Sequence, residues 1–184
     1  MHSPQPKRGT LFLIVGPSGV GKDTLISASR DQLSNTHIFP KRFITRPATP
    51  DAEEHISVTQ AAFEELERHG FFALTWQAHG QHYGIPVTIT DELARGHHVV
   101  INVSRSSVQE AKRLYEPVRI VLITASGETL KHRLEERNRD TPEDVQARLL
   151  RMVDVAPDFT IFNDTSVAVG VAALLNVLRA KWVL

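Results

Sequence analysis

The stretch LFLIVGPSGVGKDTL, residues 11–25, decides the fold of this chain. Its first five residues are apolar and have the composition of a strand that is buried on both faces. The segment GPSGVGK at residues 16–22 fits the pattern Gly-x-x-x-x-Gly-Lys and leads into a helical pattern. A strand, this loop and a helix in that order predict a phosphate loop that binds a nucleoside triphosphate.

The residue types of the loop define its chemistry. Glycines allow successive backbone N–H groups to turn toward one anion, and the positive end of the following helix faces the same point. Lys22 is placed to reach the β- and γ-phosphates and to follow the charge during transfer. The predicted ATP contacts are the loop and the first helical turn: Gly16, Pro17, Ser18, Gly19, Val20, Gly21, Lys22, Asp23 and Thr24.

Position 23 departs from the usual pattern. A Ser or Thr normally supplies a hydroxyl ligand to Mg²⁺ there, whereas this chain has Asp23. A carboxylate is a hard oxygen ligand and serves a magnesium ion at least as well. Two interpretations stay open: Asp23 meets Mg²⁺, directly or through water, or it caps the helix while Thr24 takes the metal.

Composition limits the class of protein. The 184 residues fit a single domain, and 21 basic residues balance 21 acidic ones, so we expect no nucleic-acid partner and no membrane partner. The chain has no cysteine, which excludes disulfides and thiolate chemistry and fits a reducing cytoplasm. The first ten residues are polar and lack a secretory pattern, so we expect a cytoplasmic protein. The sequence does not indicate an oligomeric state.

Strand and helix patterns alternate along the rest of the chain. Apolar runs at 99–103, 119–124 and 159–162 resemble the first strand, and helical patterns occupy 22–33, 106–114, 127–137, 142–155 and 167–181. This alternation predicts an α/β fold, a P-loop NTPase with a mostly parallel five-stranded sheet flanked by helices. Residues 9–36 and 92–184 form the predicted core. Residues 37–91, with a helix at 60–69, form a predicted inserted subdomain.

Arginines cluster around a predicted turn between two helices. The turn is expected to act as a lid at about 137–148, and the cluster comprises Arg133, Arg137, Arg139 and Arg148. Guanidinium groups near a phosphate loop neutralise the charge that spreads over a transferred phosphoryl group. We therefore predict catalytic roles for Lys22, Arg133, Arg137 and Arg148. The alternative is a solvated helix face paired with Glu135 and Glu136.

Several motifs together resemble the guanylate kinase family, over residues 9 to about 178. They are GPSGVGKDTL at the loop, ITRP at 44–47, SVTQAAFEEL at 57–66, HYGI at 82–85, and RLEER through ARL in the lid region. The resemblance implies that the segment 37–91 binds the acceptor and that Arg42, Arg46 and Tyr83 hold its phosphate. It also implies that Arg137 and the segment FND, which contains Asn163, border the adenine of ATP.

The base-reading residues of that family are missing. At the corresponding positions this chain has Leu74, and Asn102 and Ser104, where the family uses acidic residues to bind guanine N–H groups. Leu74 accepts no hydrogen bond, so we expect no GMP kinase activity. Arg105 adds a cation next to Ser104; it either binds the acceptor or only precedes the next helix at the surface.

The loop GKDT, the segment NVSR and the lost acidic residues resemble the ribose 1,5-bisphosphate phosphokinases of phosphonate degradation. This resemblance implies ATP as co-substrate with Mg²⁺, ribose 1,5-bisphosphate as acceptor and 5-phosphoribosyl 1-diphosphate as product. The predicted acceptor contacts are Arg42, Arg46, Tyr83, Asn102, Ser104 and Arg105. A phosphate acceptor is mostly dianionic at neutral pH, so we assign no general base.

Alternative functions also stay open. One is a guanylate-type or other small-metabolite kinase on the same fold, and another is a non-catalytic interaction module, which the intact Lys22 and arginines disfavour. His79 and His82 lie three residues apart without a third ligand nearby, so we interpret them as polar loop residues and not as a metal site. Trp76 and the pair Phe71 and Phe72 are expected to pack within the subdomain.

Overall fold

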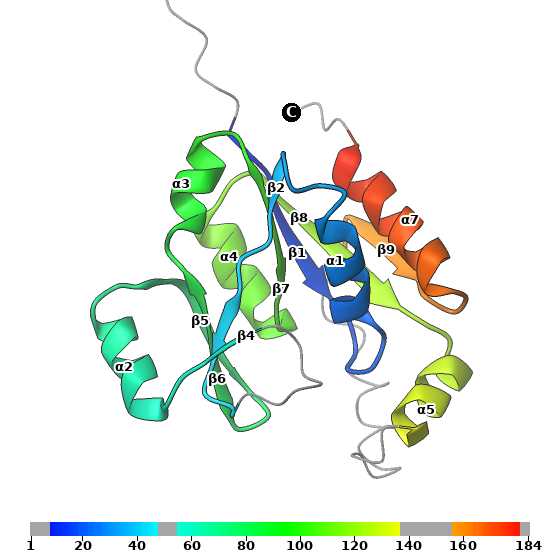
Figure 1. The fold of residues 1–184 in the computed structure, drawn as a ribbon, viewed down its shortest axis with the longest axis horizontal. Helices are drawn as coiled ribbons and strands as arrows, with labels where there is room; N and C mark the ends of the chain where they lie inside the picture. The colour runs from blue at the N-terminus through cyan, green and yellow to red at the C-terminus, as the bar shows by residue number, and fades with distance from the viewer. Residues whose placement is uncertain (1–7, 48–54, 137–155, 181–184) are drawn as a thin grey trace, which may run out of the picture. The chain divides into compact units, whose positions relative to one another are not determined.

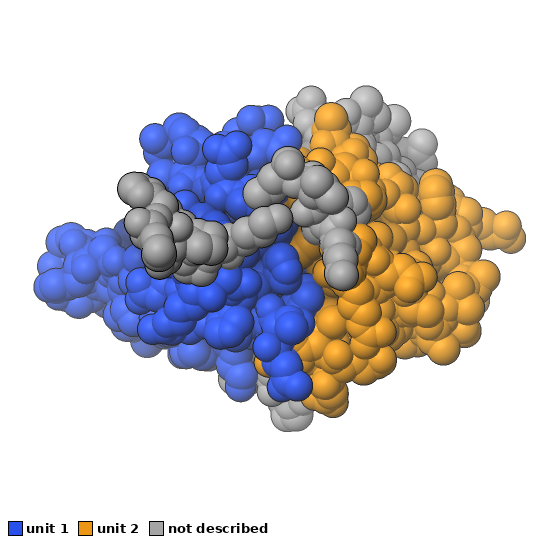
Figure 2. All heavy atoms as spheres, turned by 90° about the horizontal axis from the view of Figure 1, so that it is seen from above, with its two compact units in different colours: residues 1–11, 35–118 blue, residues 12–34, 119–184 orange. Residues whose placement is uncertain are grey.

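The computed structural model describes residues 8–47, 55–136 and 156–180 of the chain. The chain divides into two compact units, drawn in blue and orange in Figure 2. Unit 1 comprises Met1–Leu11 and Asn35–Val118, and unit 2 comprises Phe12–Ser34 and Arg119–Leu184. Each unit is described by itself below.

The chain has an α/β fold whose larger sheet has five strands in the order β2-β7-β1-β8-β9 (Figure 1). The strands are β2 (His37–Ile38), β7 (His98–Asn102), β1 (Leu11–Val15), β8 (Val118–Thr124) and β9 (Phe159–Phe162). Strands β2 and β7 pair in parallel in unit 1, and β8 and β9 pair in parallel in unit 2. The predicted fold class, an α/β P-loop fold with a parallel five-stranded sheet, is confirmed.

The central strands are buried on both faces, as their apolar runs predict. All five side chains of β1 are completely buried. Consecutive apolar residues of β7 and β8 are also buried, among them Val100 and Val121. A strand covered on both faces has no polar side to show, so it appears in the sequence as a continuous apolar run.

The described residues of unit 2 include the phosphate loop and three helices. Helix α1 (Lys22–Arg30) follows β1, α5 (Gly127–Glu136) follows β8, and α7 (Val167–Arg179) follows β9. Helices α1 and α7 pack side by side (Figure 1), and the close approach is at Gly170, next to the side chain of Leu25. Ser166 caps α7 by accepting a hydrogen bond from the N–H of Val169.

Unit 1 contains a second sheet of four strands in the order β4-β3-β6-β5. These are β3 (Arg42–Ile44), β4 (His55–Ser57), β5 (Phe72–Ala78) and β6 (Gln81–Pro86). Strands β5 and β6 form a hairpin with the two-residue turn His79-Gly80, and both turn residues have positive φ angles, 52° and 70°. Positive φ at both central residues is the geometry of a type I′ turn, which matches the twist of paired strands.

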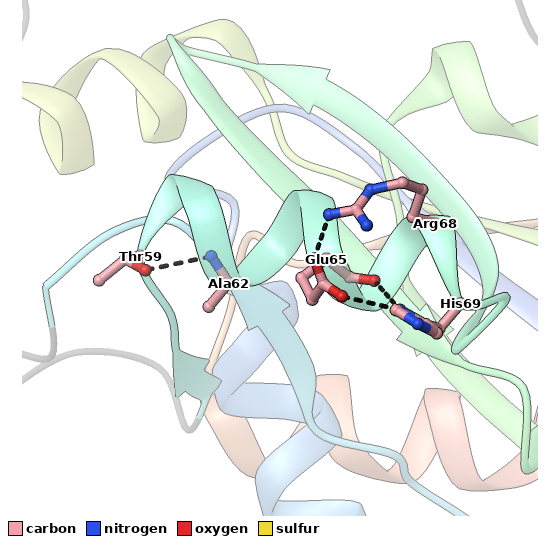
Figure 3. Close-up of polar contacts among 5 residues, drawn as sticks. All are labelled: Thr59, Ala62, Glu65, Arg68 and His69. Atoms are coloured by element: carbon pink, nitrogen blue, oxygen red, sulfur yellow. Dashed lines mark hydrogen bonds and ion pairs between the residues drawn. The ribbon is translucent and has the colours of Figure 1, made fainter.

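Helix α2 (Gln60–Arg68) covers this smaller sheet through Phe63, which is buried and stacked on Phe72 with ring centroids 4.7 Å apart. Thr59 caps the helix by accepting a hydrogen bond from the N–H of Ala62 at 3.2 Å (Figure 3). At the other end of α2, Glu65 pairs with Arg68 and His69. Phe71 and Phe72 pack edge to face with Phe43, as expected for core residues of the subdomain.

Short elements differ most from the sequence prediction. The predicted subdomain begins at residue 37, whereas residues 37 and 38 form β2, which pairs with β7 in the larger sheet. Helix α3 (Ile89–Ala94) was not predicted, and the helix predicted at 106–114 begins as the 3₁₀ turn η1 (Arg105–Ser107) before α4 (Val108–Leu114). The helix predicted at 22–33 ends earlier, at Arg30. Elements of two to six residues contain too few turns or alternations to give a periodic signal.

Two further predictions lie outside the described residues: the helix at 142–155 and the lid at about 137–148. Within the described ranges, no helix is long and apolar enough to cross a membrane.

Candidate active site

The phosphate loop of unit 2, residues 16–22, connects β1 to α1 as predicted. A Cβ atom on Gly16 would lie 2.0 Å from the carbonyl oxygen of Ile123 in β8, so only glycine lets the chain leave β1 along this path. Gly21 is the N-cap of α1 with a φ of 94°. Because glycine has no side chain to accept from the first-turn amides, this helix end is suited to an anionic ligand.

Lys22 lies over the start of the loop. Its Nζ donates hydrogen bonds to the carbonyl oxygens of Gly16 and Pro17, both at 2.8 Å. These contacts keep the ammonium group at the loop, where the motif requires it to meet phosphate oxygens.

The carbonyl of Val20 is the point where distant residues meet the loop. Nδ2 of Asn163 donates to this oxygen at 2.7 Å, and Nη1 of Arg133 donates to it at 3.3 Å. Both residues were predicted for the donor site, Arg133 as a catalytic residue and Asn163 as a neighbour of adenine. Their contacts in unit 2 are with the loop backbone.

Asp23 and Thr24 lie in the first turn of α1 and are both exposed. Oxygen ligands of this kind suit Mg²⁺, and a carboxylate in the first turn also interacts favourably with the helix dipole. The donor set next to the loop therefore fits a magnesium ion, and both interpretations of position 23 remain open.

A contact that the sequence did not predict joins the ends of β8 and β9. Oδ1 of Asp164 accepts a hydrogen bond from the backbone N–H of Ser126 at 2.7 Å. The hydrogen bonds from Ser126 lower the pKa of Asp164, so the carboxylate stays ionised. The sequence signal was the FND segment, which identified the position but not the partner.

In unit 1, Arg42 is held by two other predicted residues. Its Nη1 donates to the carbonyl oxygen of Asn102 at 2.9 Å, and its guanidinium carbon lies 5.7 Å from the centre of the Tyr83 ring. Tyr83 in turn stacks on Trp76, with ring centroids 5.3 Å apart and planes 6° apart. Trp76 therefore supports the residue on which Arg42 lies, in addition to its predicted packing role.

Arg46 contacts β4 through its backbone. Its carbonyl oxygen accepts hydrogen bonds from Oγ of Ser57 at 2.6 Å and from Nε2 of His55 at 3.4 Å. Its own Nε is buried and meets no acceptor among the described residues. A buried donor of this kind suits an anion that brings its own oxygen atoms.

His55 belongs to the same region and was missed by the sequence analysis. It is the Cα partner of Arg42 in the parallel pairing of β3 with β4. Burial lowers its pKa, and the positive charges of Arg46 and Arg42 lower it further. Burial is the main cause of this lowered pKa, and both arginine charges act in the same direction.

The segment after β7 contains the remaining predicted acceptor residues. Ser104 caps η1, since its Oγ accepts from the Ser106 N–H at 3.4 Å and from the Ser106 hydroxyl at 2.9 Å. Arg105 is partly exposed at the start of η1, and η1 contacts β5. Asn102 offers its carbonyl to Arg42.

Leu74 lies on β5 opposite Ile85 of β6 and is 3% exposed. The neighbouring inward side chain is Trp76, which is 8% exposed. At the place where the family resemblance expects an acidic reader of guanine, the chain has a packed apolar surface. Burying an amine-bearing purine edge there would leave its N–H groups without acceptors.

Some predicted residues are not described or form no site. Arg137, Arg139 and Arg148 lie outside the described residues. His79 lies in the hairpin turn, and the His82 ring contacts Gln60 and Gln77. In the part of the chain that the structure describes, no three His, Asp or Glu side chains are arranged to hold a metal ion.

Comparisons with known proteins support the resemblance to guanylate kinases that the sequence motifs indicate. The family model for guanylate kinase matches residues 8–168. Ribose 1,5-bisphosphate phosphokinase PhnN of Brucella melitensis is 42% identical over 185 residues, covering 97% of this chain and 96% of that protein. The protein of the same name from Acidiphilium cryptum is 42% identical over 94% of both chains.

Two further matches differ in length or in identity. A bifunctional ribose 1,5-bisphosphokinase-thymidine phosphorylase of Cupriavidus pinatubonensis is 41% identical over 93% of this chain, but the match spans only 29% of that longer protein. The crystal structure of guanylate kinase from Anaplasma phagocytophilum superimposes with a TM-score of 0.73, covering 96% of this chain and 88% of that chain at 18% identity. At that identity the likeness concerns the fold alone.

Proposed function

The chain belongs to the guanylate kinase family, and we propose that it is a kinase that transfers the γ-phosphoryl group of ATP to ribose 1,5-bisphosphate. The product is 5-phosphoribosyl 1-diphosphate. Two relatives that match nearly their full length carry the name of this activity, at 42% identity. A small phosphorylated sugar is its acceptor, nucleic acid and membranes are not partners, and the cytoplasm is its compartment.

One observation in unit 1 supports this acceptor most strongly. The sheet that contains Arg42 and Arg46 has a buried leucine, Leu74, where a guanine reader would be. Arg42, Arg46 and Tyr83 supply cationic and hydrogen-bonding groups for phosphate, and the apolar packing around Leu74 supplies nothing for a base. A phosphorylated sugar without a base matches both properties.

On the donor side, the N–H groups of the loop and of the first turn of α1 bind the phosphates of ATP. Lys22 exchanges its two carbonyl acceptors, on Gly16 and Pro17, for oxygens of the β- and γ-phosphates. Asp23 or Thr24 would hold Mg²⁺, which would supply positive charge to offset the negative charge of the phosphates. Arg133, which already reaches the loop, adds charge at the transferred group, and Arg137 and Arg148 are proposed to do the same.

The transfer itself needs no general base. The second pKa of a phosphate monoester is near 6, so the attacking phosphate oxygen carries negative charge at neutral pH. That oxygen forms a bond to the γ-phosphorus while the bond from the γ-phosphorus to the bridging oxygen breaks, and ADP leaves with the electron pair. The barrier is the repulsion between two anions, which arginine side chains reduce. Arg42, Arg46 and Arg105, with Tyr83, Asn102 and Ser104, hold the acceptor.

The proposal is tested by measuring ADP formation with Mg·ATP and a panel of acceptors: ribose 1,5-bisphosphate, GMP, ribose 5-phosphate and gluconate. We expect rapid ADP release only with ribose 1,5-bisphosphate. Release with GMP and none with ribose 1,5-bisphosphate would assign the chain to the guanylate-type kinases instead. No release with any acceptor would favour a non-catalytic module.

A further inference from the structure

We propose that Asn163 is a positioning residue of the phosphate loop and does not read the adenine ring. Its side-chain amide holds the carbonyl of Val20, and through that carbonyl it orients the N–H group that Gly21 presents to the donor phosphates. The inference rests on the proposed function only in requiring a nucleoside triphosphate as donor.

The hydrogen bond between these two residues is short, buried and long-range. Nδ2 of Asn163 donates to the Val20 carbonyl oxygen at 2.7 Å, across 143 positions of the chain. Asn163 is 5% exposed, so its side chain is almost completely removed from solvent. Little of this side chain is therefore accessible to a ligand ring.

Two glycines form the niche that encloses the amide. A Cβ atom on Gly21 would lie 2.7 Å from Nδ2 of Asn163, and a Cβ atom on Gly170 of α7 would lie 2.7 Å from its Oδ1. The backbone of Asn163 is fixed as well, because its N–H donates to the carbonyl oxygen of Thr124 at the end of β8, at 2.7 Å. The amide is therefore held from both sides and from its own backbone.

The nitrogen and the oxygen of the Asn163 amide differ in their hydrogen bonding. Since the Val20 carbonyl can only accept, the nitrogen must face it, which assigns the amide orientation. Oδ1 is buried and has no hydrogen-bond donor among the described residues. A buried, unpartnered oxygen costs stability, so stability alone does not account for an asparagine at this position.

The effect on the donor site follows from the planar peptide bond. The Val20 carbonyl and the Gly21 N–H belong to one peptide unit, and in a trans peptide these two groups point in opposite directions. Holding the carbonyl toward Asn163 therefore turns the Gly21 N–H away from Asn163, to the side of the loop that binds phosphate. Nη1 of Arg133 donates to the same carbonyl and therefore favours the same orientation of this peptide unit.

An adenine contact and a loop-positioning role predict different losses of ligand affinity when Asn163 is replaced. Replacing a residue that reads adenine should weaken the binding of ATP more than that of GTP, and should leave the binding of a base-free phosphate ligand unchanged. Replacing a residue that positions the loop should weaken the binding of ATP, GTP and inorganic pyrophosphate by the same factor, because all three contact the same N–H groups.

The experiment compares the full-length wild-type chain with Asn163→Leu and Asn163→Ala by titration calorimetry, using Mg²⁺ complexes of ATP, GTP and pyrophosphate. Asn163→Leu keeps the branching and approximate size of the side chain but adds no charge and has no N–H group, so the hydrogen bond to the Val20 carbonyl is lost. We expect both variants to bind all three ligands roughly three- to tenfold more weakly, the loss expected for one buried hydrogen bond. The ratio of ATP to GTP affinity should stay that of the wild type, and circular dichroism should confirm that both variants fold.

A second variant perturbs the Asn163 amide without changing residue 163. Gly170→Ala touches no ligand, but its new methyl group would press on Oδ1 of Asn163, and it would also meet Cδ2 of Leu25 at 2.9 Å. We expect it to weaken the binding of the same three ligands, and to weaken it less in the Asn163→Ala background than in the wild type, because only the contact with Leu25 then remains.

The outcomes are distinct. Loss of ATP binding alone, or binding by Asn163→Leu equal to that of the wild type, overturns the positioning role while leaving the proposed function intact. A wild-type chain that binds none of the three ligands overturns the proposed function, and this inference with it.

Discussion

Asp23 lies exposed in the first turn of α1, one position after Lys22 of the phosphate loop. If its carboxylate meets Mg²⁺, Asp23→Asn removes a charged ligand and should raise the Mg²⁺ concentration needed for half-maximal activity. The loss of a charge-assisted contact corresponds to roughly ten- to hundredfold. A magnesium titration of the initial rate at saturating substrates measures this. An unchanged Mg²⁺ requirement in Asp23→Asn, combined with a raised Mg²⁺ requirement in Thr24→Val, would identify Thr24 as the metal ligand instead.

Arg42 uses both the plane and the donors of its guanidinium group. It lies over Tyr83 and donates to the Asn102 carbonyl, and a lysine cannot do both at once. We expect Arg42→Lys to raise the KM for ribose 1,5-bisphosphate by about tenfold or more while leaving the KM for ATP within about twofold. Steady-state kinetics with each substrate varied in turn gives both constants.

The neighbouring exposed cation offers the control. Lys41→Ala removes a positive charge one position away, from an exposed side chain. If it raised the acceptor KM as much as Arg42→Lys does, the effect would come from the general charge of unit 1 and the specific role of Arg42 would be wrong.

At the residue scale, the sequence predicted those positions whose chemistry is tied to fixed spacing. The phosphate loop, Lys22 and the N-cap glycine follow from one local pattern. His55 does not, because its place beside Arg42 depends on the parallel pairing of β3 with β4, which no local pattern encodes. The role of Ser104 as a cap of η1 likewise depends on a backbone turn that its residue type alone does not specify.

Helix α2 shows what a single cap contributes to an element. The Thr59 hydroxyl accepts from the Ala62 N–H, one of the four donors at the helix start that have no partner within the helix (Figure 3). Thr59→Ala should lower the free energy of unfolding by about 1 kcal/mol. For a chain of this size that corresponds to a decrease in melting temperature of roughly 2–4 °C, measurable by calorimetry.

The conservative variant separates capping from packing. Thr59→Ser keeps the hydroxyl and loses only a methyl group, so its stability should stay close to that of the wild type. Equal destabilisation by the alanine and serine variants would show that the cap hydrogen bond contributes nothing.

At the element scale, length decides what can be predicted. The bounds of β1 and β9 match the sequence prediction, because each is a short, mainly apolar run bordered by glycine or polar residues. Strand β2 has two residues and exists because β7 offers its edge for pairing. Helix α3 has six residues and is held by packing against β7, an influence from outside its own sequence.

The pH dependence of stability concerns the chain as a whole and is set in part by His98 at the start of β7. Its Nδ1 accepts a hydrogen bond from the Thr10 N–H at 2.9 Å, which only an unprotonated nitrogen can do. Burial lowers its pKa below the ordinary value of 6.5, and the neighbouring His97 lowers it further. At pH values between the lowered pKa of His98 in the folded chain and its ordinary value of 6.5, the unfolded chain binds more protons than the folded one. The free energy of unfolding therefore falls as the pH decreases below about 6.5.

The variant His98→Asn tests this assignment, since an asparagine side chain keeps an acceptor oxygen but does not titrate. We expect the variant to flatten the decrease in the free energy of unfolding between pH 7 and 5, measured by urea denaturation at each pH. Glu92, whose pKa is lowered by its hydrogen bond with His97, contributes only at more acidic pH, below its ordinary value of 4.5. His55, with a lowered pKa of its own, contributes equally to both proteins. A decrease in His98→Asn as steep as in the wild type would assign the effect to other groups.

At the scale of the molecule, the fold class could be predicted from the sequence, because alternating strands and helices behind a phosphate loop allow few topologies. The candidate site was predictable only in part. Its charged residues were identified, but the contacts between Asn163 and Val20, and between Trp76 and Tyr83, join positions that sequence spacing does not relate.

The central claim is that the acceptor site recognises a phosphorylated sugar and no nucleobase. The most direct measurement is a competition in one tube: equimolar ribose 1,5-bisphosphate and GMP with limiting Mg·ATP, followed by ³¹P NMR of the products. The ratio of the two products gives the ratio of kcat/KM for the two acceptors. We expect the phosphoryl group in 5-phosphoribosyl 1-diphosphate with GDP at background level, whereas a predominance of GDP would contradict the account.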